Sequence, residues 1–327
     1  MNTVRWGLLS TANINRRLIP AIRASQRGEL VAVASRSEES ARAYAAEWDI
    51  PKAFGNYEGL LASGAVDAVY IGLPNHLHAE WTIRALRSGL HVLCEKPFVL
   101  SLKEMDAVIQ AAEDTGNVVT EAFMYRHHPQ TKIVGDWIRE GRLGEIKTVR
   151  GVFNFKMGEG ENVRLVPEYG GGSLWDIGIY PLSFAQYVFG GAPSLVTGIQ
   201  TLGTTGVDET FVGQMRYPGG GLAQISDSFR SPFHTEIDIM GSQGRLRLTR
   251  PFVGVEEGTV TFYPEQGEPQ PVDVPAKELY LGEVEDMHAA ILDGAESYLS
   301  LQETRDHVRT ALALYASARS GGQPIAL

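Results

Sequence analysis

Residues 10–15 follow an apolar stretch and carry the small and polar side chains that a phosphate-binding turn needs. In a dinucleotide-binding domain, the turn between the first strand and the first helix brings backbone N–H groups to a pyrophosphate, and three glycines normally allow that approach. In "RWGLLSTANINRR" no glycine follows Gly7. Serine and alanine are the next smallest side chains, so a pyrophosphate site is one interpretation. An ordinary helix start capped by Ser10 or Thr11 is the other. The residues of the turn are Ser10, Thr11, Ala12, Asn13 and Ile14.

A second candidate contact ends the next apolar stretch, "LVAVASRS". A carboxylate at this place binds the ribose 2′-hydroxyl of NAD, whereas an arginine suits the 2′-phosphate of NADP through charge-assisted hydrogen bonds. Ser35 and Arg36 stand here, so the sequence favours NADP over NAD. The alternative is a solvated arginine before a helix that Ser37 caps.

The elements that would position these residues alternate in type up to residue 121. Short apolar runs rich in Val, Leu and Ala are typical of parallel strands that helices cover on both faces. This alternation predicts a doubly wound, Rossmann-like α/β domain over 1–121 that binds NADP. The expected helices are 13–24, 38–47, 77–88 and 102–115.

The spacing of apolar residues changes in the remainder of the chain, 122–327. Ile237 and Ile239 alternate with acidic residues, and this period of two predicts an open, mostly antiparallel sheet in a C-terminal α+β domain for substrate binding and oligomerisation. The turns "PGGG" and "GSQG" are expected to supply positive φ angles. Two helices, 283–293 and 302–318, should close the chain, the second packing back on an earlier element such as the first domain.

Composition narrows the class of partner. The net charge of −10 disfavours nucleic acid and anionic membranes. The chain shows no leader sequence and no long apolar run, which predicts a cytoplasmic protein. The single cysteine, Cys94, lies in an apolar run and is expected to be a buried thiol. No metal site is expected, because no cysteine or carboxylate cluster completes a set of ligands around the histidines.

The most distinctive stretch is "LPNHLHAEWTIRALRSGLHVLCEKP" at 73–97. Together with "EAFMYRHHPQ" at 121–130, "GGGSLWDIGIYPLSFA" at 170–185 and the altered first turn, it resembles the glucose-fructose oxidoreductase/inositol dehydrogenase (Gfo/Idh/MocA) family over essentially the whole chain. The branches that it resembles most are the NADP-dependent D-xylose/aldose 1-dehydrogenases and the dimeric dihydrodiol dehydrogenases. Those branches similarly read "SRS"-like after the second strand.

The resemblance implies a catalytic set. Lys96 matches the family's Glu-Lys-Pro lysine, which lies near the nicotinamide and the substrate hydroxyl. Glu95 would orient this turn. Pro97 would stiffen it, and a cis peptide bond before Pro97 is one way of doing so. Tyr180 matches the acid/base position, where inositol dehydrogenases carry His. Asp176 matches a carboxylate one turn earlier, which could hold a substrate hydroxyl or Lys96.

The resemblance also implies cofactor and substrate contacts. The loop beside the nicotinamide is Leu73, Pro74, Asn75 and His78, while Arg126, with His127, should lie near the substrate. Residues 156–169 match no family motif, which leaves the identity of the substrate open.

The residue types suit hydride transfer from a carbinol carbon, because a base must take the hydroxyl proton. A tyrosine with a pKa of about 10 is a weak base, but a neighbouring ammonium favours its phenolate. Asp176 and Tyr180 are four residues apart, so one helix would point both the same way. The alternatives are a solvated Lys96, a core Tyr180 and an Asp176 that only caps a helix.

These observations predict an NADP-dependent oxidoreductase that acts on a pyranose aldose, such as D-xylose or D-glucose, at C1. A keto-sugar reductase or a trans-dihydrodiol-type dehydrogenase is the alternative within this class, and the direction of the reaction stays open. A catalytically silent NADP-binding sensor is the alternative of another class. An exposed apolar sheet face would need cover, which predicts a homodimer or homotetramer through the C-terminal sheet.

Overall fold

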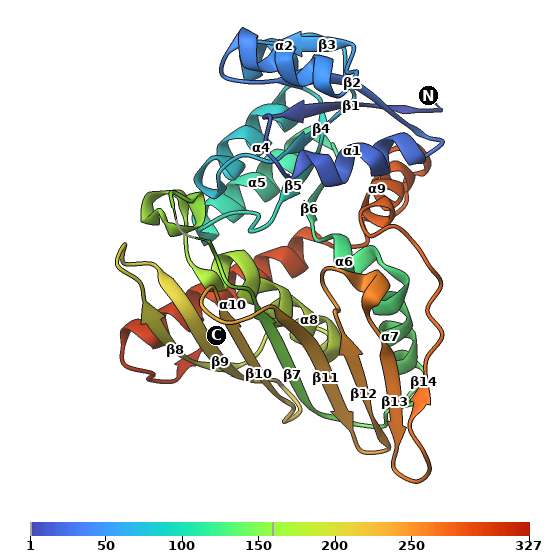
Figure 1. Cartoon of the computed structure of the whole chain (residues 1–327), viewed down its shortest axis with the longest axis vertical. Coiled ribbons are helices and arrows are strands. Elements are labelled where there is room, and N and C mark those ends of the chain that lie inside the picture. Colours follow the sequence, from blue (N-terminus) through green and yellow to red (C-terminus); the bar gives the residue numbers. More distant parts are fainter. Residues whose placement is uncertain (1, 159) are drawn as a thin grey trace. The chain divides into compact units, whose positions relative to one another are not determined.

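The computed structural model describes residues 2–158 and 160–327, and they form two units (Figure 1). The first unit contains residues up to His127 together with Glu278–Thr304, and the second contains His128–Lys277 and Arg305–Leu327. The units are therefore not two consecutive segments, as 1–121 and 122–327 would be, because residues 278–304 return to the first. Each unit is described by itself below.

The first unit is built on a six-stranded parallel sheet in the order β3-β2-β1-β4-β5-β6. This order is that of the dinucleotide-binding doubly wound fold. The α/β prediction is confirmed. The strands are β1 (Val4–Leu9), β2 (Gly28–Ala34), β3 (Lys52–Phe54), β4 (Ala68–Ile71), β5 (His91–Glu95) and β6 (Val119–Ala122).

The helices of this unit bury one apolar side each. In α1, for example, Leu18, Ile19 and Ile22 are fully buried while the arginines of the same helix face water. The helices are α1 (Asn15–Ala24), α2 (Glu38–Glu47), α3 (Tyr57–Leu61), α4 (His78–Arg87), α5 (Leu102–Thr115), α6 (Met124–His127) and α9 (Leu281–Asp293), with a 3₁₀ turn η1 (Asn75–Leu77).

Helix α9 returns late in the sequence and is anchored on β1. The indole N–H of Trp6 donates to Nε2 of His288 at 2.8 Å, and Nδ1 of the same ring lies 3.1 Å from Ser25 Oγ. Burial lowers the pKa of His288 to about 4, so the ring is neutral at neutral pH and its Nδ1 carries the proton. This contact explains why residues 278–304 group with the first unit.

The second unit contains a nine-stranded sheet in the order β14-β13-β12-β11-β7-β10-β9-β8-β15. Every neighbouring pair is antiparallel except β7 and β10, which confirms the predicted mostly antiparallel sheet. The strands are β7 (Ile146–Asn154), β8 (Leu195–Leu202), β9 (Asp208–Arg216), β10 (Leu222–Ser228), β11 (His234–Gly241), β12 (Gly244–Thr249), β13 (Val260–Pro264), β14 (Gln270–Pro271) and β15 (Ile325–Ala326).

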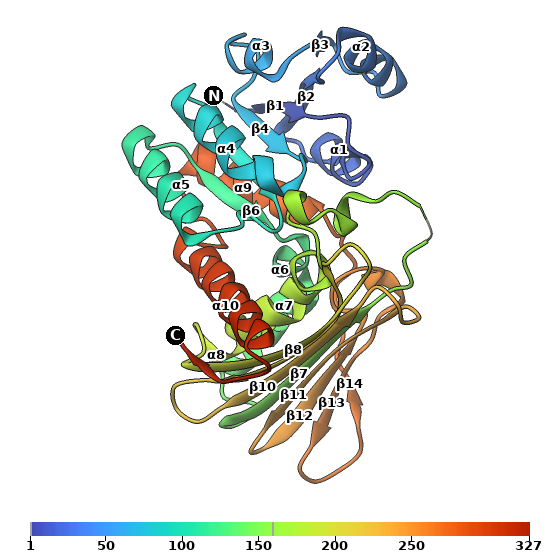
Figure 2. The same cartoon turned by 90° about the vertical axis from the view of Figure 1, so that its left-hand side faces the viewer.

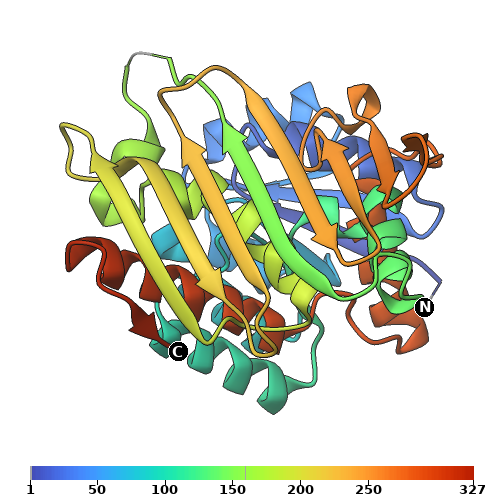
Figure 3. The ribbon, with the colours of Figure 1, turned by 90° about the horizontal axis from the view of Figure 1, so that it is seen from below.

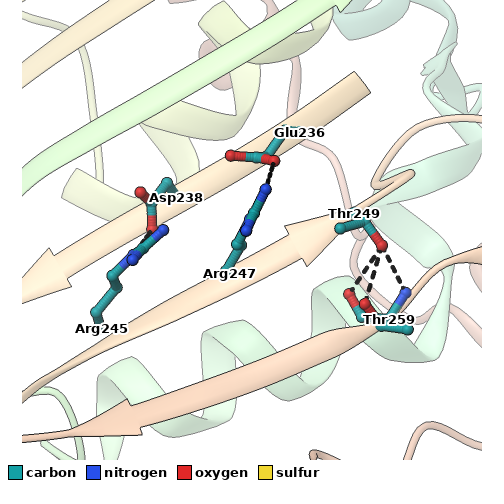
Figure 4. A network of polar contacts seen from close by, with 6 residues as sticks. All are labelled: Glu236, Asp238, Arg245, Arg247, Thr249 and Thr259. Atoms are coloured by element: carbon teal, nitrogen blue, oxygen red, sulfur yellow. Dashed lines mark hydrogen bonds and ion pairs between the residues drawn. The ribbon is translucent and has the colours of Figure 1, made fainter. Parts of the chain in front are cut away.

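The two faces of this sheet differ as the period of two predicts. Ile237 and Ile239 are fully buried, on the face that α8 (Ile179–Phe189) and α10 (Leu301–Arg319) cover (Figures 1 and 2). On β11 and β12 the alternate positions pair by charge instead, as Arg247 does with Glu236 at 2.5 Å (Figure 4). Figure 3 shows this sheet face-on.

The remaining helices of the second unit are short or lie on the sheet. His128 is the N-cap residue of α7 (Pro129–Arg139), and its side chain accepts a hydrogen bond from the Gln130 N–H. From Arg305 on, α10 groups with the second unit, and its Leu314 carbonyl approaches Gly198 of β8. The sheet of the second unit is therefore its main packing partner. The short turns are η2 (Val163–Leu165), η3 (Pro167–Tyr169), η4 (Leu174–Gly178) and η5 (Val255–Glu257).

The two glycine turns have different reasons for their glycines. Gly219 and Gly220 adopt φ values of 87° and 91°, as predicted for "PGGG". The prediction for "GSQG" is wrong, since neither Gly241 nor Gly244 has a positive φ. A Cβ at Gly241 would collide with the Leu143 carbonyl, so close approach of backbone requires that glycine. In the described chain no helix is both long and apolar enough to cross a membrane.

Candidate functional site

The first strand–helix turn of the first unit holds a serine in a glycine conformation. Ser10 has a φ of 125°, a region that residues with a Cβ rarely adopt. Its hydroxyl donates to the Gly72 carbonyl at 3.0 Å and accepts from the Ala12 N–H at 3.2 Å, and the Asn15 amide donates to its carbonyl at 2.8 Å. The turn thus keeps the backbone shape of the glycine motif and stabilises it by side-chain hydrogen bonds.

Helix α1 begins after this turn without a side-chain cap. The alternative in which Ser10 or Thr11 caps the helix is wrong, because no side chain caps α1 at its N-cap residue, Ile14. Within residues 2–158 and 160–327, the N–H groups of Asn13 and Ile14 have no hydrogen-bond acceptor. Free N–H groups at a helix start are what a pyrophosphate requires. The residues of this turn therefore fit a dinucleotide.

The end of β2 provides a candidate phosphate contact. The Ser35 N–H bonds the Phe54 carbonyl, and Ser37 caps α2 by accepting from the Ser40 N–H at 3.1 Å. Arg36 is exposed, and its guanidinium pairs with no acidic side chain of the described residues. A cavity of about 320 Å³ lies nearby between α1 and α2. Its lining residues are Thr11, Asn13, Arg16, Ser40, Ala43, Tyr44 and Glu47.

Two further turns of this unit are joined by one histidine. The buried His78 ring lies between two backbone carbonyls, with Nε2 2.7 Å from Leu73 O and Nδ1 2.8 Å from Pro97 O. Its position links the 73–75 loop, with Pro74 and Asn75, to the Glu-Lys-Pro turn. Burial lowers the pKa of His78, which disfavours a second proton on the ring. The Lys96–Pro97 bond is cis.

Glu95 makes hydrogen bonds on both sides of the turn that carries Lys96. Its Oε1 accepts from the Tyr70 hydroxyl at 2.5 Å, and its Oε2 accepts from the Lys96 N–H at 3.2 Å. Burial, reinforced by the charge of Glu95, raises the pKa of Tyr70 far above its usual value, so that tyrosine remains a donor. Sequence reasoning missed Tyr70, although a tyrosine inside the buried strand "AVYI" is a signal that its hydroxyl has a partner.

A second carboxyl of this unit, Glu283 on α9, was also missed. It is 1% exposed, and neither of its oxygens has a hydrogen-bond partner among the described residues. Burial raises its pKa well above the usual range, and the charges of Glu95 and Glu278 add to the shift. Its protonated form is therefore favoured. A glutamate at a core-facing position of the helix "LGEVEDM" is the signal that could have revealed it.

Arg126 has a structural role in this unit. Its side chain is 2% exposed and forms an ion pair with Glu303 at 2.5 Å. His127 is equally buried and lies 2.6 Å from the Asp286 carboxylate. This ion pair anchors Arg126 within the first unit, and its contact with substrate, which the resemblance implies, stays a prediction.

In the second unit, the glycines of "YGGGSL" let the backbone approach its neighbours closely. A Cβ at Gly171 would lie 2.5 Å from the Arg164 carbonyl, and one at Gly172 would collide with the Asp208 carboxylate. The Gly172 N–H also donates to the Arg164 carbonyl at 2.9 Å. These contacts join the unmatched segment 156–169, of which residue 159 lies outside the described residues, to the start of η4.

Asp176 and Tyr180 do not share one regular helix. Asp176 lies in η4, a five-residue π-helical turn, and Tyr180 lies in the first turn of α8. The four-residue rule for a common face therefore does not apply across this stretch, because a π-turn inserts an extra residue. The Asp176 carboxylate accepts from Arg164 Nε at 2.6 Å and makes no helix cap.

Tyr180 is 5% exposed, and its ring packs against two phenylalanines. The ring centroids of Phe153 and Phe252 each lie 5.4 Å from that of Tyr180. This packing fixes the ring, so the place of its hydroxyl depends on the backbone of η4 and α8.

Cys94 is buried, and burial raises its pKa well above the usual value, which confirms an inert thiol. Among the described residues no group of three or more metal-ligating side chains is present.

Models of known protein families and curated proteins match this chain over most of its length. Residues 4–123 match the model described as "Oxidoreductase family, NAD-binding Rossmann fold", and residues 132–247 match the "GFO/IDH/MocA C-terminal domain". "D-xylose 1-dehydrogenase (NADP(+)) 2" of Haloferax volcanii is 37% identical over 97% of this chain and 98% of that protein. "Trans-1,2-dihydrobenzene-1,2-diol dehydrogenase" of Bos taurus is 32% identical over 76% of this chain and 75% of that protein.

Two solved structures are similar to this chain over almost its whole length. The aldose-aldose oxidoreductase from Caulobacter crescentus, complexed with glycerol, covers 99% of this chain and 100% of its own, with 25% identity and a TM-score of 0.92. KijD10, a 3-ketoreductase from Actinomadura kijaniata in complex with NADP and TDP-benzene, covers 98% of both chains, with 30% identity and a TM-score of 0.87.

Proposed function

The chain belongs to the Gfo/Idh/MocA family of NAD(P)-binding oxidoreductases, and from that premise we propose that it transfers a hydride between NADP and a pyranose aldose such as D-xylose or D-glucose, at C1. Similarity to an NADP-dependent D-xylose 1-dehydrogenase over nearly the full length of both proteins carries this proposal. The exposed Arg36, which suits a 2′-phosphate, supports NADP as the cofactor.

We infer that the cofactor is held by three parts of the first unit. The backbone of Thr11, Ala12, Asn13 and Ile14 would hold the pyrophosphate, Ser35 and Arg36 the 2′-phosphate, and the 73–75 loop the nicotinamide end. The bound nicotinamide supplies or accepts the hydride. His78 and Glu95 contribute by holding the loop and the turn in place, since their polar atoms bond to backbone of those segments.

In the proposed reaction, Tyr180 takes the substrate hydroxyl proton and Lys96 stabilises the charge that develops. Asp176 holds a substrate hydroxyl, and Arg164 fixes that carboxylate. Solved structures of KijD10 include a Lys→Ala and a Tyr→Phe variant. The two exchanged positions are separated by the same number of residues as Lys96 and Tyr180. This spacing supports the assignment of a lysine and tyrosine pair.

Reduction of a keto-sugar is the second candidate function. A "1,5-anhydro-D-fructose reductase" of Ensifer adhaerens is 33% identical over 97% of both chains, and KijD10 is a 3-ketoreductase. The same acid/base pair would then give a proton to a carbonyl oxygen. A trans-dihydrodiol-type substrate remains a third possibility because of the Bos taurus relative.

The purified protein should be tested with NADP and a panel of aldoses by following absorbance at 340 nm. An increase with D-xylose or D-glucose would support the proposal. No change with aldoses, but oxidation of NADPH by a keto-sugar, would favour the reductase. Tight NADP binding without turnover on either panel would leave the silent sensor.

We also propose that a second copy of this chain covers the open sheet face of the second unit, giving a homodimer or homotetramer. Ile199 and Leu222, which stand on strands of this sheet, are 66% and 47% exposed. A hollow of about 330 Å³ is lined in part by Arg150, Gln214 and Leu222. Exposed apolar area of this kind favours association. A monomer in light scattering at micromolar concentration would contradict the proposal.

A cytoplasmic location is part of the same proposal. The only cysteine, Cys94, leaves no internal disulfide to form, which suits a reducing compartment. Fractionation of the producing cells would test it.

A further inference from the structure

A buried carboxylate of the second unit holds the start of η4. Asp208, at the first position of β9, is 3% exposed. Its Oδ2 accepts from the Ser173 hydroxyl at 2.9 Å and from the Leu174 N–H at 2.7 Å, while its Oδ1 accepts from the Tyr315 hydroxyl at 2.8 Å. Three donors converge on one carboxylate, and each of these hydrogen bonds favours its ionised form. Asp208 thereby caps a helix from a strand that is distant in sequence.

A second buried carboxyl lies against the other end of the same turn. Asp227 on β10 is 1% exposed, and neither of its oxygens has a hydrogen-bond partner among the described residues. The nearby Ser173 hydroxyl donates to Asp208 instead. A Cβ at Gly178, the last residue of η4, would collide with Asp227 Oδ2, so this carboxyl packs directly on the turn.

Burial and the neighbouring charges favour the protonated form of the Asp227 carboxyl group. Burial raises the pKa of Asp227 well above its usual value, and the carboxylates of Asp208 and Asp176 raise it further. Burial also raises the pKa of Asp208, but its three donors oppose that shift, so within this buried pair the negative charge is favoured on Asp208.

The turn is consequently held along its whole length. Asp208 bonds its beginning, Asp227 packs on its end, and Arg164 binds the Asp176 side chain. Tyr180 lies two residues beyond Gly178, and its ring is packed between phenylalanines. A change in where the turn begins would therefore move the phenol, and small displacements of a reacting group have large effects on rate.

We propose that Asp208, bonded to Tyr315, is a positioning residue that sets the register of the π-helical turn and so the place of the Tyr180 hydroxyl. Neither residue touches substrate in this proposal. The inference rests on the proposed role of Tyr180 as the acid/base group.

Two variants separate hydrogen bonding from packing. Asp208→Asn keeps the volume but sets an amide NH₂ against at least one of the three donors. Tyr315→Phe removes one hydroxyl and leaves the other two bonds to Asp208. Tyr217→Phe is the matched control, because Tyr217 is likewise buried in this unit, and among the described residues its hydroxyl contacts the Met215 sulfur, at 3.7 Å, and no carboxylate.

The first measurement does not need turnover. Full-length protein labelled with ¹³Cζ-tyrosine gives one resonance per tyrosine, and Tyr180→Phe assigns that of Tyr180. We expect the Tyr180 resonance and its pH titration to shift in Asp208→Asn and, less, in Tyr315→Phe, with no shift in Tyr217→Phe. An unmoved Tyr180 resonance in Asp208→Asn would overturn the positioning role.

The second measurement is the pH profile of kcat with NADP and the best sugar of the panel. Asp208→Asn should lower kcat by about 10- to 100-fold and displace the basic limb of the profile, while KM and the NADP dissociation constant change little. An unchanged kcat and pH profile in the folded variant would reduce Asp208 to a stabilising residue. If the wild-type protein turns over no substrate while its Tyr180 resonance still responds to Asp208→Asn, the proposed function fails and the positioning role stands.

Discussion

The turn that carries Lys96 and the turn that carries Asp176 are both irregular, and side chains hold the backbone of each from different distances along the chain. In the first unit, Glu95 accepts from the N–H of the next residue, Lys96, and His78, 19 residues before Pro97, lies 2.8 Å from the Pro97 carbonyl. In the second unit the irregularity lies in the helix itself, and Asp208 accepts from the N–H of Leu174, 34 residues away. The first turn is therefore held by residues near it in sequence, and the second by a residue of a distant strand.

Both turns also have a buried carboxyl group close by. Glu283 in the first unit and Asp227 in the second are each 1% exposed, without a hydrogen-bond partner in the described chain. Burial raises the pKa of each well above its usual range, and the charge of Glu95 adds to the shift at Glu283, as the charges of Asp208 and Asp176 do at Asp227. Each turn therefore lies next to an acid whose protonated form is favoured, whether the turn is held from near or from far along the chain.

The largest expected effect tests whether the two turns serve one reaction. Lys96→Ala and Tyr180→Phe should each lower kcat by about 10²- to 10⁴-fold, because each removes a group that acts in proton transfer. Tyr180→Phe keeps the ring that packs on Phe153 and Phe252. Turnover at 340 nm measures the effect, and circular dichroism checks the fold. Activity close to wild type in either variant would remove that residue from the mechanism.

The next largest effect concerns the two buried acids, Glu283 and Asp227, and the pH dependence of the free energy of unfolding. An acid whose pKa is raised on folding keeps its proton while the unfolded chain loses it, so stability falls as pH rises above the unfolded pKa of about 4. Each group contributes a loss of up to about 1.4 kcal/mol per pH unit until its folded pKa is reached. Glu283→Gln and Asp227→Asn should therefore both flatten the decline in unfolding free energy between pH 5 and pH 8.

Urea unfolding at several pH values measures this decline. Glu285→Gln, on the same helix as Glu283, is the control, because it removes an exposed carboxyl group instead of a buried one. If only one of the two acid variants flattens the curve, the likeness between the turns is broken.

A third prediction concerns Arg36, whose guanidinium pairs with no acidic side chain of the described residues. Arg36→Ala should raise the KM for NADP by about 10- to 100-fold, as expected for the loss of charge-assisted hydrogen bonds, and should leave the KM for NAD nearly unchanged. Arg42→Ala, on the exposed side of α2, is the matched control. Equal effects of Arg36→Ala on both cofactors would rule out a 2′-phosphate contact.

The smallest expected effect concerns the strained serine. Ser10→Ala loses two hydrogen bonds and keeps the φ of 125°, whereas Ser10→Gly loses the same bonds but removes the strain. We expect Ser10→Gly to be more stable than Ser10→Ala by about 1 kcal/mol. The difference in urea midpoint between the two variants isolates the strain. An Ala variant as stable as the Gly variant would mean that the hydroxyl, and not the backbone, decides this position.

The sequence allowed the architecture to be predicted, because apolar periodicity distinguishes the parallel sheet from the alternating strands of the second one. It also pointed to Lys96, Tyr180 and Arg36. The π-helical turn could not be predicted, since Asp208, which bonds its first residue, lies on a strand more than thirty residues away. The burial of Arg126 was missed for the same reason, because its partner Glu303 lies far along the chain.

The nine-stranded sheet has a further consequence at its margins. Its outermost strands, β14 and β15, have two residues each, and β14 contains Pro271, which cannot donate to a further strand. Such short outermost strands present little edge of their own to a further strand, which limits growth of the sheet at these two positions. A copy of the chain bound on the open face would bury Ile199 and Leu222 instead, and such an assembly would end once the face is covered.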